Sequence, residues 1–118
     1  MSETSTVEER VARYLIRQMM DDKEVLIVTG RFHYARSFVV GMMGDIFKER
    51  GFVGKTTNDT LEVEGLPTLR ITSLGTPEDV AGRAFDHICF IAVPTPRRVD
   101  MLTFLMQARG DTFTWSKI

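Results

Sequence analysis

The sequence predicts one α/β domain with a three-layer, mostly parallel sheet and a short hairpin. Two short apolar runs, residues 24–29 and 86–93, are rich in β-branched side chains and have the composition of buried strands. Segments with helical spacing of apolar residues alternate with these runs, which is typical of parallel α/β sheets. The 118 residues suffice for a single domain, which we expect to span 1–118 with 1–5 as a loose N-terminus.

The first half of the chain predicts helix, strand, helix and hairpin in that order. Residues 6–21 have a helical apolar pattern. Ser5 and Thr6 are both cap candidates, with Glu8 and Glu9 three residues beyond them, as in a capping box. After the strand at 24–29, residues 35–50 have one apolar face and end before a glycine, as helices often do. Two short strands at 60–65 and 68–73 are then predicted to form a hairpin.

The second half predicts a short helix, a strand, a helix and a final strand. The segment 76–85 opens with Thr76 as a cap and Pro77 in the first helical position. The buried strand at 86–93 follows, and residues 95–110 then open a helix in the same way with Thr95. Residues 111–118 are predicted to form the last strand.

Composition limits the classes of function. The net charge of −1 gives no overall basic field for nucleic acid, so an anion site requires a local cluster. The single cysteine excludes an internal disulfide and fits a reducing compartment. No apolar stretch is long enough to span a bilayer, and the polar, acidic N-terminus is unlike a secretory signal. We expect a cytoplasmic location, in the host cytoplasm if the chain is viral.

A degenerate phosphate-loop pattern follows the first strand. Gly30 begins G-x-x-x-x-A-R-S, where a phosphate loop has G-x-x-x-x-G-K-[ST], so Ala35 and Arg36 replace the second glycine and the lysine. Nucleotide hydrolysis also needs a carboxylate at the end of a neighbouring strand to hold Mg²⁺. The candidate strand at 86–93 ends in Ala92 and Val93 instead, and its Asp86 lies at the other edge. We therefore expect no catalytic residues, no metal and no cofactor.

Basic and aromatic residues follow both buried strands, where loops after parallel strands gather at one edge of a sheet. Arginines can bind phosphates while rings stack on bases, which suits single-stranded nucleic acid. Plainer roles are solvated arginines, rings packed on the first helix and a histidine with a local hydrogen bond. Ser73 and Thr76 are further hydroxyl donors from a third loop. The predicted nucleic-acid or anion site comprises Arg31, Phe32, His33, Tyr34, Arg36, Ser37, Arg97 and Arg98.

From Glu24 onward the order of elements resembles the RecA-like ATPase core of phage terminase large subunits and related helicases. A strand and phosphate loop lead to a helix and a hairpin, and Gly82 matches the glycine before the Walker B strand. The resemblance implies a RecA-like, P-loop NTPase-like sheet and a phage protein. Ala35, Arg36 and the acid-free strand end depart from the family pattern. A small core of this kind is also similar to the Drc-type single-stranded-DNA-binding transcription regulators of podoviruses.

These observations give three functional hypotheses. The first is a non-catalytic single-stranded nucleic-acid-binding protein, a phage transcription or replication factor that forms homo-oligomers and has a polymerase or another viral protein as a further partner. The second is a nucleotide-binding or weakly hydrolysing P-loop relative. The third is a phage interaction protein that modulates a host or viral machine, with the contact made by the first helix or by the strand that contains Trp115.

Overall fold

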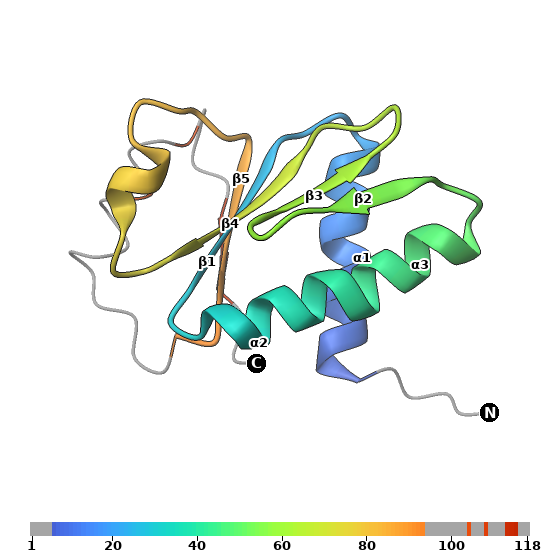
Figure 1. Ribbon diagram of the computed structural model, residues 1–118, viewed down its shortest axis with the longest axis horizontal. Helices are drawn as coiled ribbons and strands as arrows, with labels where there is room; N and C mark the ends of the chain where they lie inside the picture. The colour runs from blue at the N-terminus through green and yellow to red at the C-terminus, as the bar shows by residue number, and fades with distance from the viewer. Residues whose placement is uncertain (1–5, 94–103, 105–107, 109–112, 116–118) are drawn as a thin grey trace.

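The structure is a computed structural model that describes residues 6–93, 104, 108 and 113–115. Figure 1 shows a sheet flanked by helices, with elements that follow the chain in this order. They are α1 (Val7–Met20), β1 (Val25–Thr29), α2 (Phe32–Ser37), the π-helical segment η1 (Phe38–Met43), α3 (Gly44–Glu49), β2 (Gly54–Thr56), β3 (Thr60–Val63), β4 (Leu69–Ser73), the 3₁₀ helix η2 (Pro77–Val80), β5 (His87–Ile91) and β6 (Phe113–Trp115).

The sheet is mixed, with strand order β2-β3-β4-β1-β5-β6. Strand β1 lies between β4 and β5 and pairs with both in parallel, and β5 pairs in parallel with β6. The pairs β2–β3 and β3–β4 are antiparallel. The hairpin predicted from residues 60–65 and 68–73 is therefore confirmed, and β2 adds an antiparallel edge strand that was not predicted from the sequence.

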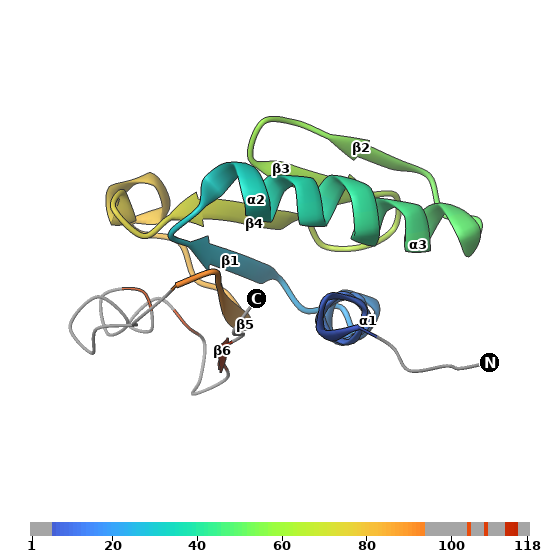
Figure 2. The same cartoon turned by 90° about the horizontal axis from the view of Figure 1, so that it is seen from below.

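The two faces of β1 bury different side chains. Val25 and Ile27 pack into a cluster with α1 and the helical segment from α2 to α3, whereas Leu26 and Val28 pack with residues of η2 and β5. Figure 2 shows α1 end-on, with the segment α2–α3 running along the sheet. Both faces of β1 are buried because helical residues cover each of them, which explains why its sequence is a continuous apolar run.

The predicted third layer rests on a helix at 95–110, and most of that segment lies outside the described residues. Phe104 is described and is buried on the second face, where its ring centroid lies 6.5 Å from that of Phe90. The described residues thus establish an α/β fold with a mixed sheet, with helices α1 and α2–α3 on one face. The three-layer and mostly parallel arrangement stays a prediction.

Of the two cap candidates at the start of α1, Thr6 makes a capping bond, and Ser5 lies outside the described residues. Thr6 has extended backbone angles, and its Oγ1 accepts a hydrogen bond of 3.1 Å from the Glu9 N–H. The predicted cap at Thr76 is wrong, because the Thr76 hydroxyl donates to the Ser73 carbonyl at 3.4 Å and makes no capping bond. The helix that follows is a single 3₁₀ turn and ends well before residue 85. Among the described helices, none has both the length and the apolar character that a bilayer crossing requires.

Candidate functional site

The candidate site lies at the edge where β1, β4 and β5 end. These strands run parallel, so the segments that follow them leave the sheet on the same side. Figure 1 shows the ends of β1 and β5 side by side where α2 begins, in agreement with the pairing of Thr29 with Ile91. We call this edge the strand-end rim, and it comprises residues 30–37, 74–76 and 92–93.

Thr29, the last residue of β1, fastens two of these segments to each other. Its Oγ1 accepts a hydrogen bond of 2.9 Å from the Arg31 N–H, and its carbonyl accepts one of 2.8 Å from the Leu74 N–H. Thr29 itself is fully buried. The turn after β1 and the loop after β4 are therefore held together at the rim.

The segment at the phosphate-loop position is a helix. We predicted a helix from residue 35, but α2 begins at Phe32, two residues after Gly30. The Ala35 N–H donates to the Arg31 carbonyl at 3.0 Å, so it is used inside the helix. A phosphate loop binds its ligand with free backbone N–H groups that converge on the phosphates. The helical segment 32–37 does not present its backbone in that way.

Arg31 and Tyr34 form a stacked pair at the rim. The Arg31 side chain is exposed, and its guanidinium carbon lies 5.3 Å from the centroid of the Tyr34 ring. This is a cation–π distance. The ring is half-buried against the core, and burial raises the pKa of the Tyr34 hydroxyl, with Glu8 adding to the rise. The rim thus combines an exposed cation with an aromatic ring, but an acidic residue of α1 lies near it.

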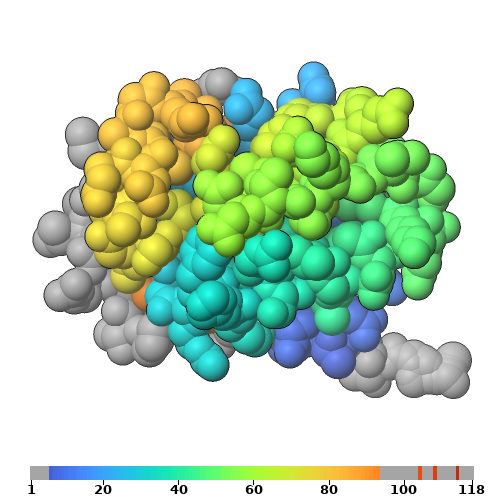
Figure 3. All heavy atoms as spheres, in the orientation of Figure 1, coloured from blue at the N-terminus to red at the C-terminus, as the bar shows by residue number. Residues whose placement is uncertain are grey.

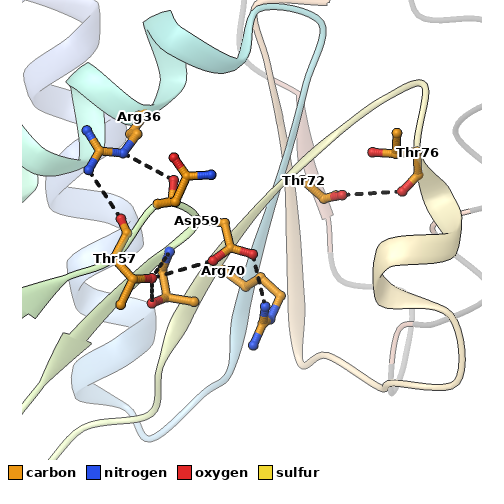
Figure 4. Close-up of polar contacts among 8 residues, drawn as sticks. Arg36, Thr57, Asp59, Arg70, Thr72 and Thr76 are labelled. Carbon is orange, nitrogen blue, oxygen red and sulfur yellow. Dashed lines mark hydrogen bonds and ion pairs between the residues drawn. The ribbon is translucent and has the colours of Figure 1, made fainter.

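Arg36 is engaged with the hairpin turn between β2 and β3. Its Nε–H donates to the Asn58 carbonyl at 3.1 Å, and its Nη2 donates to the Thr57 carbonyl at 3.3 Å (Figure 4). The same turn is tied to β4, because Arg70 forms an ion pair of 3.3 Å with Asp59. The guanidinium at the position of the phosphate-loop lysine therefore contacts peptide oxygens of this chain.

The other predicted site residues differ in exposure. His33 and Ser37 are exposed on α2, whereas Phe32 is partly buried against the core, with its ring centroid 6.4 Å from that of His33. Of the predicted residues in the first loop and helix, Arg31 and Tyr34 are thus in contact, whereas Arg36 is turned toward the hairpin. Arg97 and Arg98 lie outside the described residues.

The loop after β4 is closed by its own hydrogen bonds. The Gly75 N–H donates to the Ser73 hydroxyl at 3.3 Å, and the Thr76 N–H donates to the Ser73 carbonyl at 3.1 Å. The hydroxyl of Thr72 donates to the Thr76 carbonyl at 3.5 Å, and Figure 4 marks this contact. Ser73 and Thr76, which we predicted as donors to a ligand, thus have local partners.

The end of β5 has no carboxylate among its described residues. Ala92, with a φ of 55°, and the buried Val93 follow the strand. Asp86 lies at the opposite edge, where its Oδ2 accepts a hydrogen bond of 2.9 Å from the Glu24 N–H. Within the described ranges, no group of His, Cys, Asp and Glu side chains is placed to hold a metal ion. The rim thus has basic and aromatic groups without an acid after β5.

Two features of the rim were not predicted from the sequence. The carbonyls of Thr57 and Asn58 receive Arg36, and Glu8 of α1 lies close enough to influence Tyr34. The run of turn-forming residues at 57–60 was a usable signal for a tight turn before β3. Nothing in the local sequence relates Glu8 to Tyr34, because that proximity depends on how α1 packs.

No known family profile matches the sequence, and no curated protein matches it. Solved structures with the same fold include the large terminase of a thermophilic bacteriophage, with a TM-score of 0.71 and 12% identity over 88% of this chain and 29% of that one. A structure of the same terminase in complex with ADP has a TM-score of 0.63 and 15% identity, and this chain covers 28% of its length.

Two further structures come from other phages. The bacteriophage Phi-29 viral genome packaging motor assembly has a TM-score of 0.61 and 15% identity over 92% of this chain and 39% of that one. A mutant of the large terminase ATPase domain from Thermus phage P74-26 has a TM-score of 0.61 and 13% identity, with 92% of this chain and 54% of that domain covered. The chain therefore has the fold of phage terminase ATPase domains and spans less than a third of the terminase from the thermophilic bacteriophage.

Proposed function

We propose that this chain is a non-hydrolysing domain of the terminase ATPase fold that binds single-stranded nucleic acid at the strand-end rim. The observation that carries the proposal is the helix at the phosphate-loop position, which places Arg31, His33 and Ser37 on the surface instead of forming a phosphate cradle. The acid-free end of β5 supports the same reading, since a hydrolytic site needs a carboxylate for Mg²⁺.

The side chains at the rim suit a flexible anionic strand. Exposed Arg31 offers charge to a phosphate, and the adjoining Tyr34 ring offers a partly exposed edge for stacking. Arg97 and Arg98 follow β5 in the sequence and complete the proposed site.

Because one rim has few cations, we propose homo-oligomers in which several rims hold one strand by multivalency. The similarity to a viral genome packaging motor is consistent with a phage protein that acts on nucleic acid. The Drc-type role in transcription stays a prediction.

Fluorescence anisotropy with a labelled oligothymidylate tests the proposal. We expect micromolar binding that weakens steeply as salt rises. Arg31→Ala should weaken it by about three- to tenfold, because a phosphate contact and the support of Tyr34 are both lost. Arg83→Ala is the matched control, since Arg83 is exposed and lies just before β5 at the opposite edge of the sheet. Absence of binding at low salt, or equal losses in both variants, would contradict the proposal.

Nucleotide binding is the second candidate, and the similarity to an ADP-bound terminase favours it. On this reading the helix from Phe32 gives way to a loop when a nucleotide binds. Titration calorimetry with ATP and Mg²⁺ separates the two candidates. Heat of binding that is lost in Ser37→Ala supports this candidate, whereas a silent titration together with oligonucleotide binding supports the first.

A further inference from the structure

Helix α1 carries a row of exposed arginines on the side that faces away from the sheet. Arg10, Arg13 and Arg17 are separated by three and four residues, so they lie along one face of the helix. All three are exposed, and the side chain of Arg13 is 60% accessible. The opposite face of α1 packs on the core through Leu15, Ile16 and Met19 among others.

Exposed apolar side chains accompany these arginines. Four large hydrophobic residues are exposed in the described part of the chain, and Val7, Tyr14 and Met20 of α1 are three of them. Their exposed fractions are 49%, 39% and 47%. We define the α1 outer face as Val7, Arg10, Arg13, Tyr14, Arg17 and Met20. Aromatic residues, methionine and arginine are the types that protein interfaces favour over the rest of the surface.

Two contacts hold parts of this face in place. The Tyr14 ring meets the buried His87 ring edge-on, with 5.3 Å between centroids, so its position is fixed while part of it stays accessible. Arg50, just beyond α3, donates from Nη1 to the Met20 Sδ at 3.5 Å. The Arg50 guanidinium is therefore a fourth one beside this face, at the end of α1. Because the Tyr14 ring is already ordered, it loses little entropy when a partner binds.

Acidic residues lie at both ends of α1. Glu9 lies 3.9 Å from Arg13, but an exposed pair at that distance contributes little. Glu8 lies in the first turn, and Asp21 and Asp22 follow the helix. Arg13 and Arg17 lie in the middle of α1, between the glutamates of its first turn and the aspartates beyond its last turn, so the middle of the α1 outer face carries its positive charge. Part of α1, in blue, reaches the surface beside the segment α2–α3 in Figure 3.

From this surface we infer that the α1 outer face docks an acidic, amphipathic helix of another protein. Val7 and Tyr14 are seven residues apart, so their side chains lie two turns apart on one side of α1 and match the apolar stripe of a facing helix. Carboxylates beside that stripe would meet Arg13 and Arg17. The site is separate from the strand-end rim, and the inference does not depend on the proposed nucleic-acid binding.

Other occupants fit less well. A second copy packed antiparallel through α1 about Tyr14 brings Arg10 close to Arg17 of the other copy, and like charges oppose that pairing. A nucleic-acid strand satisfies the arginines, but its phosphates do not cover the apolar Val7 and Met20. A helix with carboxylates around an apolar stripe satisfies both kinds of side chain.

The test uses the full chain and a labelled synthetic peptide of about 20 residues, with leucines at heptad spacing flanked by glutamates. We expect micromolar binding by anisotropy and at least about tenfold weaker binding for the double variant R13E/R17E. The double variant K55E/R83E is the matched control, because it changes the net charge equally at exposed positions on the hairpin and before β5. A peptide with lysines in place of the glutamates should not bind.

Three further measurements make the result decisive. Val7→Ser, a neutral polar change at an exposed position in the first turn, should weaken peptide binding by several fold, since the inference requires an apolar contact. Arg31→Ala should leave peptide binding unchanged, so failure of the rim proposal is distinguishable from failure of this one. Thermal unfolding verifies that each variant is folded.

No peptide binding, or equal binding by R13E/R17E and the control, would overturn the inference. Loss of oligothymidylate binding in R13E/R17E with unchanged peptide binding would assign the face to nucleic acid instead.

Discussion

His87, at the residue scale, is a polar side chain enclosed between three elements. It is the first residue of β5, is fully buried, and contacts the Tyr14 ring of α1. Its Nε2 shares a hydrogen bond of 2.9 Å with the Thr114 Oγ1 of β6, while its Nδ1 has no hydrogen-bond partner among the described residues. Burial, with a smaller contribution from Lys23, lowers the pKa of His87 to about 4. The folded protein therefore favours neutral imidazole.

This lowered pKa predicts a loss of stability in mild acid. The unfolded chain takes up a proton near the usual histidine pKa of about 6.5, whereas the folded chain resists it until about pH 4. The free energy of unfolding therefore does not depend on this group above pH 6.5. It falls as the pH drops from 6.5 to 4, by at most about 3 kcal/mol in total, and His87 lowers it no further below pH 4. Urea unfolding across this range should show the decline in the wild type and in His33→Gln, whose imidazole is exposed. An equal decline in His87→Gln would refute this assignment.

Arg36 illustrates which properties of a single site residue can be predicted from the sequence and which cannot. The motif drew attention to Arg36 as a basic residue after β1. The arginine side chain is long enough to reach either a ligand or a nearby part of the chain. It reaches the carbonyls of Thr57 and Asn58, about twenty residues later in the sequence. Which acceptor is near depends on the packing of the hairpin, and no local pattern encodes that distance.

At the element scale, the start of α2 shows local helix propensity prevailing over a motif. We predicted a helix from residue 35 because a phosphate loop was expected before it. Between Gly30 and Ser37 no residue breaks a helix, and Ala35 is both a strong helix former and fully buried. The strand β2 was missed for a different reason, since all three of its residues are exposed and offer no alternation of apolar and polar side chains.

Restoring the consensus residues of the phosphate loop tests this account of α2. In the double variant A35G/R36K, glycine in the helix costs about 1 kcal/mol and loss of the Arg36 hydrogen bonds costs about 1 kcal/mol more. We expect lower stability in urea and no binding of ATP with Mg²⁺ by calorimetry, because residues 32–37 stay helical. The variant R83K serves as the control for a change from arginine to lysine at an exposed site. A clear ATP-binding signal in A35G/R36K would show that two residues alone suppress the loop.

At the scale of the whole molecule, apolar patterns predicted the central strands well. The arrangement of helices in layers on the two faces of the sheet was predicted less completely. The runs at 24–29 and 86–93 are paired neighbours in the sheet, as buried parallel strands should be. Composition located both strands because both faces of each are buried, although the second run extends beyond β5 by one residue before it and two residues after it. The order in which the hairpin joins the sheet, at the side of β4, depends on contacts between distant segments. Such contacts leave no periodic signal in the sequence.

One sheet with a cluster on each face predicts a single cooperative unfolding transition. Leu26 and Ile27 are neighbours in β1 that are fully buried in opposite clusters, so truncation of either weakens the same strand from a different side. We expect Leu26→Ala and Ile27→Ala each to cost about 2–5 kcal/mol. Tryptophan fluorescence from Trp115 of β6 and far-UV circular dichroism should give coincident curves for both variants.

Cys89 gives an independent measure of the same transition. It pairs with Ile27 and Thr114 in the sheet, and burial raises the pKa of its thiol to about 12, so a thiol reagent should react only after β5 is exposed. If the two faces unfold together, the logarithm of the labelling rate should rise in both variants in proportion to the lost free energy of unfolding. Labelling that accelerates in Ile27→Ala alone, with separate optical transitions, would show that the face bearing α1 opens by itself. In that case the two clusters would be independent units that share a strand.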